Sequence, residues 1–442
     1  MSSMKSSSPI SNFGASSKLT YSSSSSNLPS PPKEEFHSVS SPTARTSFVG
    51  VNYGTIADNL PSPADAVSLM KANGITAVRL FEPNHDIYEA LRGTSIKVSV
   101  GVLNDDLPGL ASAGVSATSG WLETHILPFV NDVSFAYITL GNEAIPGPKA
   151  QYVYTAIQNM WTSLETFNLS SQILPTAVVP AGVLGVSYPP SQGAFADNVA
   201  DIMTDVTKLV YSIGAPLMVN VYPYFALVSD PEHISTPFAL FTSTDPRFVD
   251  GELAYYNLYD AMVDAFLAAM VRVVGAEDVK IMVSESGWPS AGNEPYTTIE
   301  NAQTYNNNLK NRALSQGTPR RQSVLLDVFI FALFNEDLKA EGVEQNWGNF
   351  YPDMQPVYPL WGWRGGAVRD GGGAGDGGMR RRDWGWRRSW RWRRKEARIE
   401  RRRLKGWAGR ERRWEGLVER RGWGERSERG SGEEEKGGES GL

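Results

Sequence analysis

Short apolar runs alternate with longer amphipathic stretches between residues 48 and 361. Each run is rich in β-branched residues and is nearly continuous, without the strict alternation of a strand that has one wet face. Eight such runs cover residues 48–53, 77–81, 96–102, 135–140, 173–179, 216–221, 279–283 and 328–334. Runs of this kind are typical of strands buried on both faces, so they predict a parallel sheet covered by helices.

The stretches between the runs carry apolar residues at helical spacing. In 150–167, Val153 and Leu164 fall on one apolar face. The same spacing predicts further helices over 63–73, 256–274 and 299–315. Thr297 or Thr298 is the expected N-cap of the last of these. Eight strands alternating with helices predict right-handed crossovers, and their number favours a closed (β/α)8 TIM barrel in the α/β class over an open doubly wound sheet.

Two extensions of different composition flank this central part. Residues 1–47 are rich in Ser and Pro and contain too few large apolar residues to form a core. Residues 362–442 hold 24 Lys and Arg but only 14 Asp and Glu, although the whole chain has a net charge of −6. Both extensions are predicted to be disordered. The expected organisation is therefore an extension over 1–47, the (β/α)8 domain over 48–361, and a second extension over 362–442.

The C-terminal extension leaves several interpretations open. Eight of the 13 Trp lie in it and alternate with Arg, as in residues 390–394. Such a segment can bind phosphate backbones and stack on bases, or it can bind an anionic membrane surface. A segment rich in Arg, Trp, Gly and Glu with almost no aliphatic residues is also typical of out-of-frame translation. We favour this last interpretation, so no nucleic-acid partner is expected.

The composition excludes several classes of site. The chain has no Cys, which excludes a disulfide or a thiolate site, and its four His are scattered, which argues against a His-based metal site. We therefore expect no metal and no cofactor. No apolar run reaches the length of about 18 residues that a membrane span needs. The N-terminal residues lack the apolar segment of a secretory signal.

A Glu follows each of two apolar runs, the fourth and the seventh. Glu143 ends the segment Gly-Asn-Glu, and Glu285 lies in Ser-Glu-Ser-Gly-Trp-Pro. In (β/α)8 barrels the reactive groups sit at the C-terminal ends of the strands, where the fourth and seventh strands place side chains across the lumen from each other. Glycoside hydrolases typically use two facing carboxyl groups, one as a general acid and the other as a base or nucleophile. A single Glu at a strand end is more often part of a salt bridge or a cap, but two in these contexts predict catalysis. Asn142, beside Glu143, is placed to bind a sugar 2-hydroxyl.

Nine motifs carry a resemblance to a known family. They are Val49–Gly54, Asn59–Pro63, Arg79–Asn84, Gly141–Glu143, Asn220–Phe225, Tyr256–Asp260, Val283–Ser290, Phe334–Lys339 and Glu344–Gly348. On these motifs residues 48–361 resemble the plant endo-1,3-β-glucanases of glycoside hydrolase family seventeen. The resemblance implies retaining, endo-acting hydrolysis of β-1,3-glucan of the callose or laminarin type. It further implies that Glu143 is the general acid/base, that Glu285 is the nucleophile, and that the chain is an extracellular monomer.

Polar and aromatic side chains near the strand ends are candidates for substrate binding. They are Tyr53, Phe81, Asn142, Asn220, Tyr222, Phe225, Trp288 and Trp347. Any one of these aromatic residues is more often barrel packing than a sugar platform, but together they predict an elongated cleft. Family members typically carry Tyr and Asp where this chain has Phe81 and Glu82, which removes one hydroxyl from the expected subsites.

The resemblance also implies a supporting charge cluster after the eighth run, made of Glu336, Lys339 and Glu344. In this cluster Lys339 would hold neighbouring carboxylates ionised and oriented; the alternative is a surface ion pair of little energetic weight. Two other functions remain open for the whole chain. One is a catalytically silent glucan-binding barrel, and the other is a nucleic-acid or membrane-associated protein that acts through its basic tail.

Overall fold

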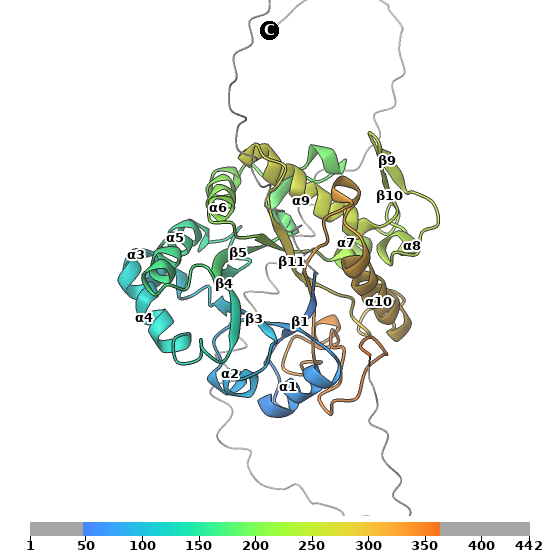
Figure 1. Ribbon diagram of the computed structural model, residues 1–442. Helices are drawn as coiled ribbons and strands as arrows, with labels where there is room; N and C mark the ends of the chain where they lie inside the picture. Colours follow the sequence, from blue (N-terminus) through green and yellow to red (C-terminus); the bar gives the residue numbers. More distant parts are fainter. Residues whose placement is uncertain (1–46, 363–442) are drawn as a thin grey trace, which may run out of the picture. The chain divides into compact units, whose positions relative to one another are not determined.

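The computed structural model describes residues 47–362, and the expectations for the two extensions lie outside this range apart from their boundary residues. Eight parallel strands close into a barrel that is ringed by helices (Figure 1), which confirms the predicted (β/α)8 fold. Around the barrel the strands follow the order β1-β12-β11-β8-β5-β4-β3-β2. Their bounds are β1 (Val49–Tyr53), β2 (Ala77–Leu80), β3 (Lys97–Val102), β4 (Ser134–Asn142), β5 (Leu174–Pro180), β8 (Leu217–Asn220), β11 (Ile281–Ser286) and β12 (Val328–Ile330).

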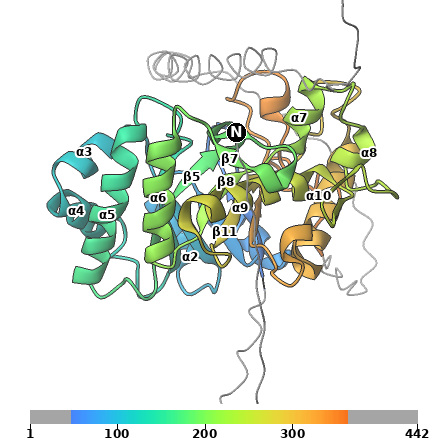
Figure 2. The same ribbon diagram turned by 90° about the horizontal axis from the view of Figure 1, so that it is seen from above.

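Helices connect the strands and cover the outside of the barrel. Among residues 47–362 they are α1 (Pro63–Ala72), α2 (His85–Leu91), α3 (Leu107–Ser112), α4 (Val115–His125), α5 (Ala150–Thr166), α6 (Ala200–Ser212), α7 (Pro223–Ser229), α8 (Thr236–Ala239), α9 (Leu258–Val274) and α10 (Ile299–Ser315). Helices α3 to α6 pack side by side along one flank, as Figure 2 shows. None of the helices in this part of the chain combines the length and hydrophobicity required to cross a bilayer.

The four helices that the apolar spacing predicted are all present. Helix α10 begins after Thr298, whose side chain accepts a hydrogen bond from the Asn301 N–H, as expected of an N-cap. Helix α9 begins two residues later than the apolar pattern suggested, because the Asn257 side chain accepts from the Asp260 N–H and caps the helix there. Two small antiparallel sheets that the pattern did not predict pair β6 (Leu184–Val186) with β7 (Ala194–Phe195) and β9 (Phe248–Asp250) with β10 (Leu253–Tyr255).

The interior of the barrel is filled by a separate apolar cluster. It is made of Phe48, Ala77, Tyr137, Val178, Met218, Met282 and Phe329, each at most 8% exposed. Most of these residues lie in different strands, and such strands can bring their side chains together only inside the closed barrel. Burial of each large member stabilises the fold by about 1.5–3 kcal/mol. The cluster closes the lumen, so a polar site can form only at a rim.

Irregular pairing occurs at the C-terminal ends of two strands. The register between β4 and β5 shifts between Thr139 and Asn142, and the register between β11 and β8 shifts between Val283 and Glu285. Bulges of this kind interrupt the ladder and redirect the neighbouring side chains. Because all barrel strands run parallel, both irregularities lie at the same rim.

The buried carboxyl of Asp264, on α9, makes stability depend on pH. Its Oδ2 accepts hydrogen bonds from the Tyr255 hydroxyl and the Arg320 N–H, both at 2.9 Å. Burial raises the pKa of Asp264 from its ordinary value of 3.8 to about 6. The folded state therefore binds this proton more tightly than the unfolded chain does. The resulting stabilisation is full at acid pH and is lost as the pH rises through the folded pKa.

The variant Asp264→Asn cannot lose this proton, so it isolates the effect. Relative to the variant, we expect the free energy of unfolding of the native chain to fall by about 2 kcal/mol from pH 4 to pH 7. Urea unfolding of both proteins at the two pH values measures the difference. The prediction would be contradicted if the free energies of unfolding of the native chain and the variant differed by the same amount at pH 4 and at pH 7.

Candidate active site

Glu143 and Glu285 lie at the same rim of the barrel. Glu143 directly follows β4, and its backbone N–H donates to the Val178 carbonyl of β5 at 3.0 Å. Glu285 lies within β11, and its carbonyl accepts from the Val221 N–H at 2.9 Å. Glu285 is 6% exposed, and Glu143 is half-buried. The structure therefore brings the two carboxylates to one end of the lumen from strands with β5 and β8 between them.

Asn220, the last residue of β8, connects the surroundings of the two carboxylates. Its Nδ2 donates to Glu143 Oε1 at 2.8 Å, and its Oδ1 accepts from the Ser284 hydroxyl at 2.7 Å. In the strand ladder Asn220 is the direct partner of Glu285. One amide thus bonds the Glu143 carboxylate from a position directly beside the Glu285 backbone.

Arg79 connects the same two regions from the other side of the barrel. Its Nη1 donates to Glu285 Oε1 at 2.6 Å, and its Nη2 donates to Asn142 Oδ1 at 2.8 Å. The Arg79 side chain is fully buried, and its guanidinium lies 4.6 Å from the centroid of the Phe81 ring. A buried cation is costly unless it is paired, and Glu285 is the acidic partner of this one. Sequence reasoning missed Arg79, although a charged residue inside an apolar strand run was a usable signal.

The Tyr222 hydroxyl completes the contacts of Glu285. It donates to Glu285 Oε2 at 2.8 Å, so both oxygens of that carboxylate accept a hydrogen bond. Burial raises the pKa of the Tyr222 phenol well above its usual value, and the charge of Glu285 raises it further. Glu143 and Glu344 act in the same direction. Tyr222 therefore remains a protonated donor at any ordinary pH.

A tight turn holds Glu143 in an unusual backbone conformation. Glu143 has φ +51°, in the left-handed region, which costs a non-glycine residue about 1 kcal/mol. Asn104 holds the turn from both sides: its Oδ1 accepts from the Asn142 N–H and its Nδ2 donates to the Asn142 carbonyl, both at 2.8 Å. Gly141 has φ +83°, and a Cβ there would meet Asn104 Oδ1 at 2.7 Å. Strain maintained in this way is common at functional sites. No sequence signal marked Asn104.

Three of the predicted aromatic residues form one wall, and the predicted aromatic residues differ in exposure. The rings of Tyr222, Phe225 and Trp347 lie 5.2–5.7 Å apart. Phe81, Tyr222 and Phe225 are partly exposed, whereas Tyr53 and Trp347 are 3% and 2% exposed. Sequence reasoning missed Phe331, whose ring lies between 5.6 and 6.3 Å from those of Phe81, Tyr222 and Trp347.

Trp288 occupies a different place from the one predicted for it. It is 0% exposed, its Nε1 donates to the Tyr296 carbonyl at 2.9 Å, and its ring packs against Tyr224 and Tyr305. The ring therefore has no face open to a sugar. We assign Trp288 to the packing behind the wall.

The charge cluster after the eighth strand is buried rather than superficial. Lys339 Nζ lies 2.7 Å from Glu336 Oε2, and the two side chains are 13% and 2% exposed. Glu336 Oε1 also accepts from the Ile56 N–H at 2.8 Å. Lys339 Nζ lies 4.4 Å from the centroid of the Phe331 ring, so the pair contacts the ring that joins Phe81, Tyr222 and Trp347. Glu344 is 8% exposed, and its charge acts on Tyr222.

A comparison with known protein families identifies the family to which this chain belongs. The sequence model of the glycosyl hydrolases family 17 matches residues 49–361. The chain is a member of glycosyl hydrolases family 17.

Within residues 47–362 no group of three His, Asp or Glu side chains is arranged to hold a metal ion.

Several plant proteins are similar to this family 17 chain over nearly their whole length. A lichenase-2 of Hordeum vulgare is 42% identical over 312 residues, which cover 71% of this chain and 97% of the relative. A glucan endo-1,3-beta-glucosidase of Vitis vinifera is 38% identical over 323 residues, 72% and 92% of the two chains. The solved structure of CJP38, a beta-1,3-glucanase and allergen of Cryptomeria japonica pollen, is 45% identical to this chain and has a TM-score of 0.68. The match covers 71% of this chain and 98% of CJP38.

Arg79 gives a direct test of the geometry at the rim of this family 17 barrel. In Arg79→Met the Glu285 carboxylate loses its charged donor and Asn142 loses a bond, so both become less well oriented. We expect kcat/KM on β-1,3-glucan to fall about 100-fold. Arg79→Lys keeps the charge but not the planar fork, so its loss should be smaller. Equal activity of native and Arg79→Met proteins, with matched thermal unfolding midpoints, would contradict the prediction.

Proposed function

We propose that this family 17 chain is an O-glycosyl hydrolase that cleaves β-1,3-glucosidic bonds within β-1,3-glucan. The printed activities of similar proteins, a glucan endo-1,3-beta-glucosidase and a beta-1,3-glucanase, support this substrate. The presence of both Glu143 and Glu285 at one rim supports turnover and argues against a silent glucan-binding barrel. All residues to which we assign a role in this chemistry lie within residues 47–362.

The proposed roles of the two carboxylates follow from their donors. Glu285 accepts from the Arg79 guanidinium and the Tyr222 phenol, two donors that orient both of its oxygens, as a nucleophile requires. Glu143 accepts from the neutral amide of Asn220, which is compatible with a group that must gain and lose a proton. We therefore assign Glu143 as general acid/base and Glu285 as nucleophile.

The reaction then takes two steps. Glu285 attacks the anomeric carbon while Glu143 protonates the departing glycosidic oxygen, which gives a covalent glycosyl-enzyme. Water next attacks the same carbon, Glu143 takes its proton, and the Glu285 carboxylate leaves, so the β configuration is retained. Asn142 and Asn220 are assigned to hydroxyls of the bound sugar, and the exposed faces of Phe81, Tyr222 and Phe225 to its C–H groups. Glu336, Lys339 and Glu344 keep this wall in place.

The observation that carries the proposal is that each carboxylate has a hydrogen-bond partner that also bonds a residue next to the other carboxylate. Asn220 bonds Glu143 and the Ser284 hydroxyl, and Arg79 bonds Glu285 and the Asn142 side chain. Its test is product analysis with the full chain on laminarin. We expect oligosaccharides of several lengths from the first minutes, with the β anomer formed first by proton NMR. Mixed-linkage β-glucan and carboxymethylcellulose serve as linkage controls. Release of glucose alone would contradict endo action, and no release would support the silent barrel.

A further inference from the structure

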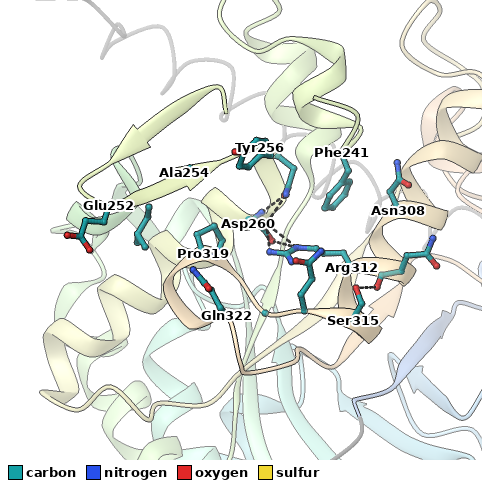
Figure 3. Close-up of a pocket in the computed structure, with 15 residues that line it drawn as sticks. Phe241, Glu252, Ala254, Tyr256, Asp260, Asn308, Arg312, Ser315, Pro319 and Gln322 are labelled. Atoms are coloured by element: carbon teal, nitrogen blue, oxygen red, sulfur yellow. Dashed lines mark hydrogen bonds and ion pairs between the residues drawn. The ribbon is translucent and has the colours of Figure 1, made fainter. Parts of the chain in front are cut away.

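A hollow of about 720 Å³ lies outside the barrel, between the β9–β10 hairpin, the start of α9 and the end of α10 (Figure 3). No residue that lines it belongs to the candidate active site. Its size falls within the range of small-molecule binding sites. It is therefore separate from the candidate active site.

The lining of this hollow contains a buried ion pair between Asp260 and Arg312. Arg312 Nη2 lies 2.6 Å from Asp260 Oδ2, and Arg312 Nε donates to both Asp260 oxygens at 3.1 Å. Asn257 Nδ2 donates to the same carboxylate at 2.7 Å. Glu252 is the other charged residue in the lining. The lining offers no uncompensated positive charge, so it does not suit a phosphate or another anion.

The rim of the hollow carries an aromatic ring and several amides. Tyr256 is 46% exposed, although large aromatic side chains usually avoid such exposure. Asn311, Gln316 and Gln322 are exposed, and their side-chain amides have no hydrogen-bond partner among the described residues. Amides supply both donors and acceptors, as sugar hydroxyls require, and an aromatic face accepts sugar C–H groups. Together they match a neutral carbohydrate.

We propose that this hollow is a second glucan-binding site, which holds a β-glucan chain away from the point of cleavage. Tyr256 stacks on one glucosyl unit, and Asn311 and Gln322 bind the hydroxyls of its neighbours. The identity of the sugar rests on the proposed function, whereas the existence of a neutral polar site rests on the hollow itself. Such a site raises the local concentration of polysaccharide and leaves short substrates unaffected.

Binding is measured by co-sedimentation of the full chain with insoluble β-1,3-glucan, in a Glu285→Ala background that prevents digestion. Adding Tyr256→Ala should weaken binding about tenfold, and adding the double change Asn311→Ala with Gln322→Ala should also weaken it. Tyr211→Ala is the matched control, because Tyr211 is 36% exposed on α6 and lies outside the hollow. In otherwise native protein, Tyr256→Ala should leave cleavage of laminarihexaose unchanged while it slows digestion of the insoluble glucan.

Unchanged sedimentation in both the Tyr256 and the double variants, or equal losses in Tyr256→Ala and Tyr211→Ala, would overturn the proposal. So would failure of the Glu285→Ala chain to sediment with glucan at all. Thermal unfolding verifies that each variant is folded, and laminarihexaose cleavage adds a check for the variants made in otherwise native protein. If the native chain fails to cleave laminarihexaose, the proposed function fails, and the sedimentation difference between the two Tyr variants still decides the fate of the second site.

Discussion

Replacing Glu285 by Ala is expected to reduce turnover of β-1,3-glucan by about 10⁴-fold or more. The carboxylate would form the covalent bond to the anomeric carbon, and the Ala side chain cannot form it. Arg79 and Tyr222 would then surround a space that a small anion can enter, since both donate into it. Added azide should therefore restore turnover of an activated aryl β-glucoside of laminari-oligosaccharides.

The configuration of the rescued product makes this prediction specific. Azide attacking from the side of the missing carboxylate gives a glycosyl azide of inverted α configuration, which proton NMR identifies. Glu300→Ala, at the exposed start of α10, is the matched control and should keep native activity. Full activity of Glu285→Ala would refute the nucleophile assignment.

Replacing Glu143 by Gln should separate substrates by the quality of their leaving group. A natural glucan needs protonation of the departing oxygen, so its cleavage should slow by about 10²–10⁴-fold. A dinitrophenyl glycoside needs little protonation, so its first step should remain fast and release a burst of dinitrophenolate. The second step still lacks its base, so the steady rate stays low until azide is added, and the azide product then keeps the β configuration.

Stopped-flow measurement of the burst, compared with reducing-sugar release from laminarin, checks the prediction. Asn220→Ala gives a useful comparison, since it removes a donor to Glu143 without removing the carboxylate. If Glu143→Gln slows the dinitrophenolate burst as much as it slows laminarin cleavage, the result would count against the acid/base role. It would point to a general disturbance of the turn that holds Glu143.

Local sequence pattern predicted the barrel because the signals it depends on are local. Each strand is buried on both faces and therefore appears as an apolar run, and each long helix shows one apolar face. The catalytic Glu candidates were visible for the same reason: both lie within three residues of the end of such a run. The start of α9 was misplaced by two residues because the Asn257 cap overrides the apolar pattern there.

Contacts between distant residues were not visible in this way. Arg79 and Glu285 are separated by 206 positions, and nothing near either residue indicates that the Arg79 side chain crosses the lumen. Asn104 lies outside every motif, and its function depends on the Asn142 backbone that it clamps. Exposure was equally inaccessible: Trp288 and Tyr256 lie in comparable motifs, yet the first is 0% and the second 46% exposed.

The sequence by itself determined the eight-stranded barrel, the two Glu candidates and the family, because burial periodicity and short motifs are properties of neighbouring residues. Only the tertiary structure decided which donors hold each carboxylate, which aromatic rings remain open, and where a second hollow forms. Those features arise from side chains that meet only after the barrel closes, and closure depends on the packing of all eight strands at once.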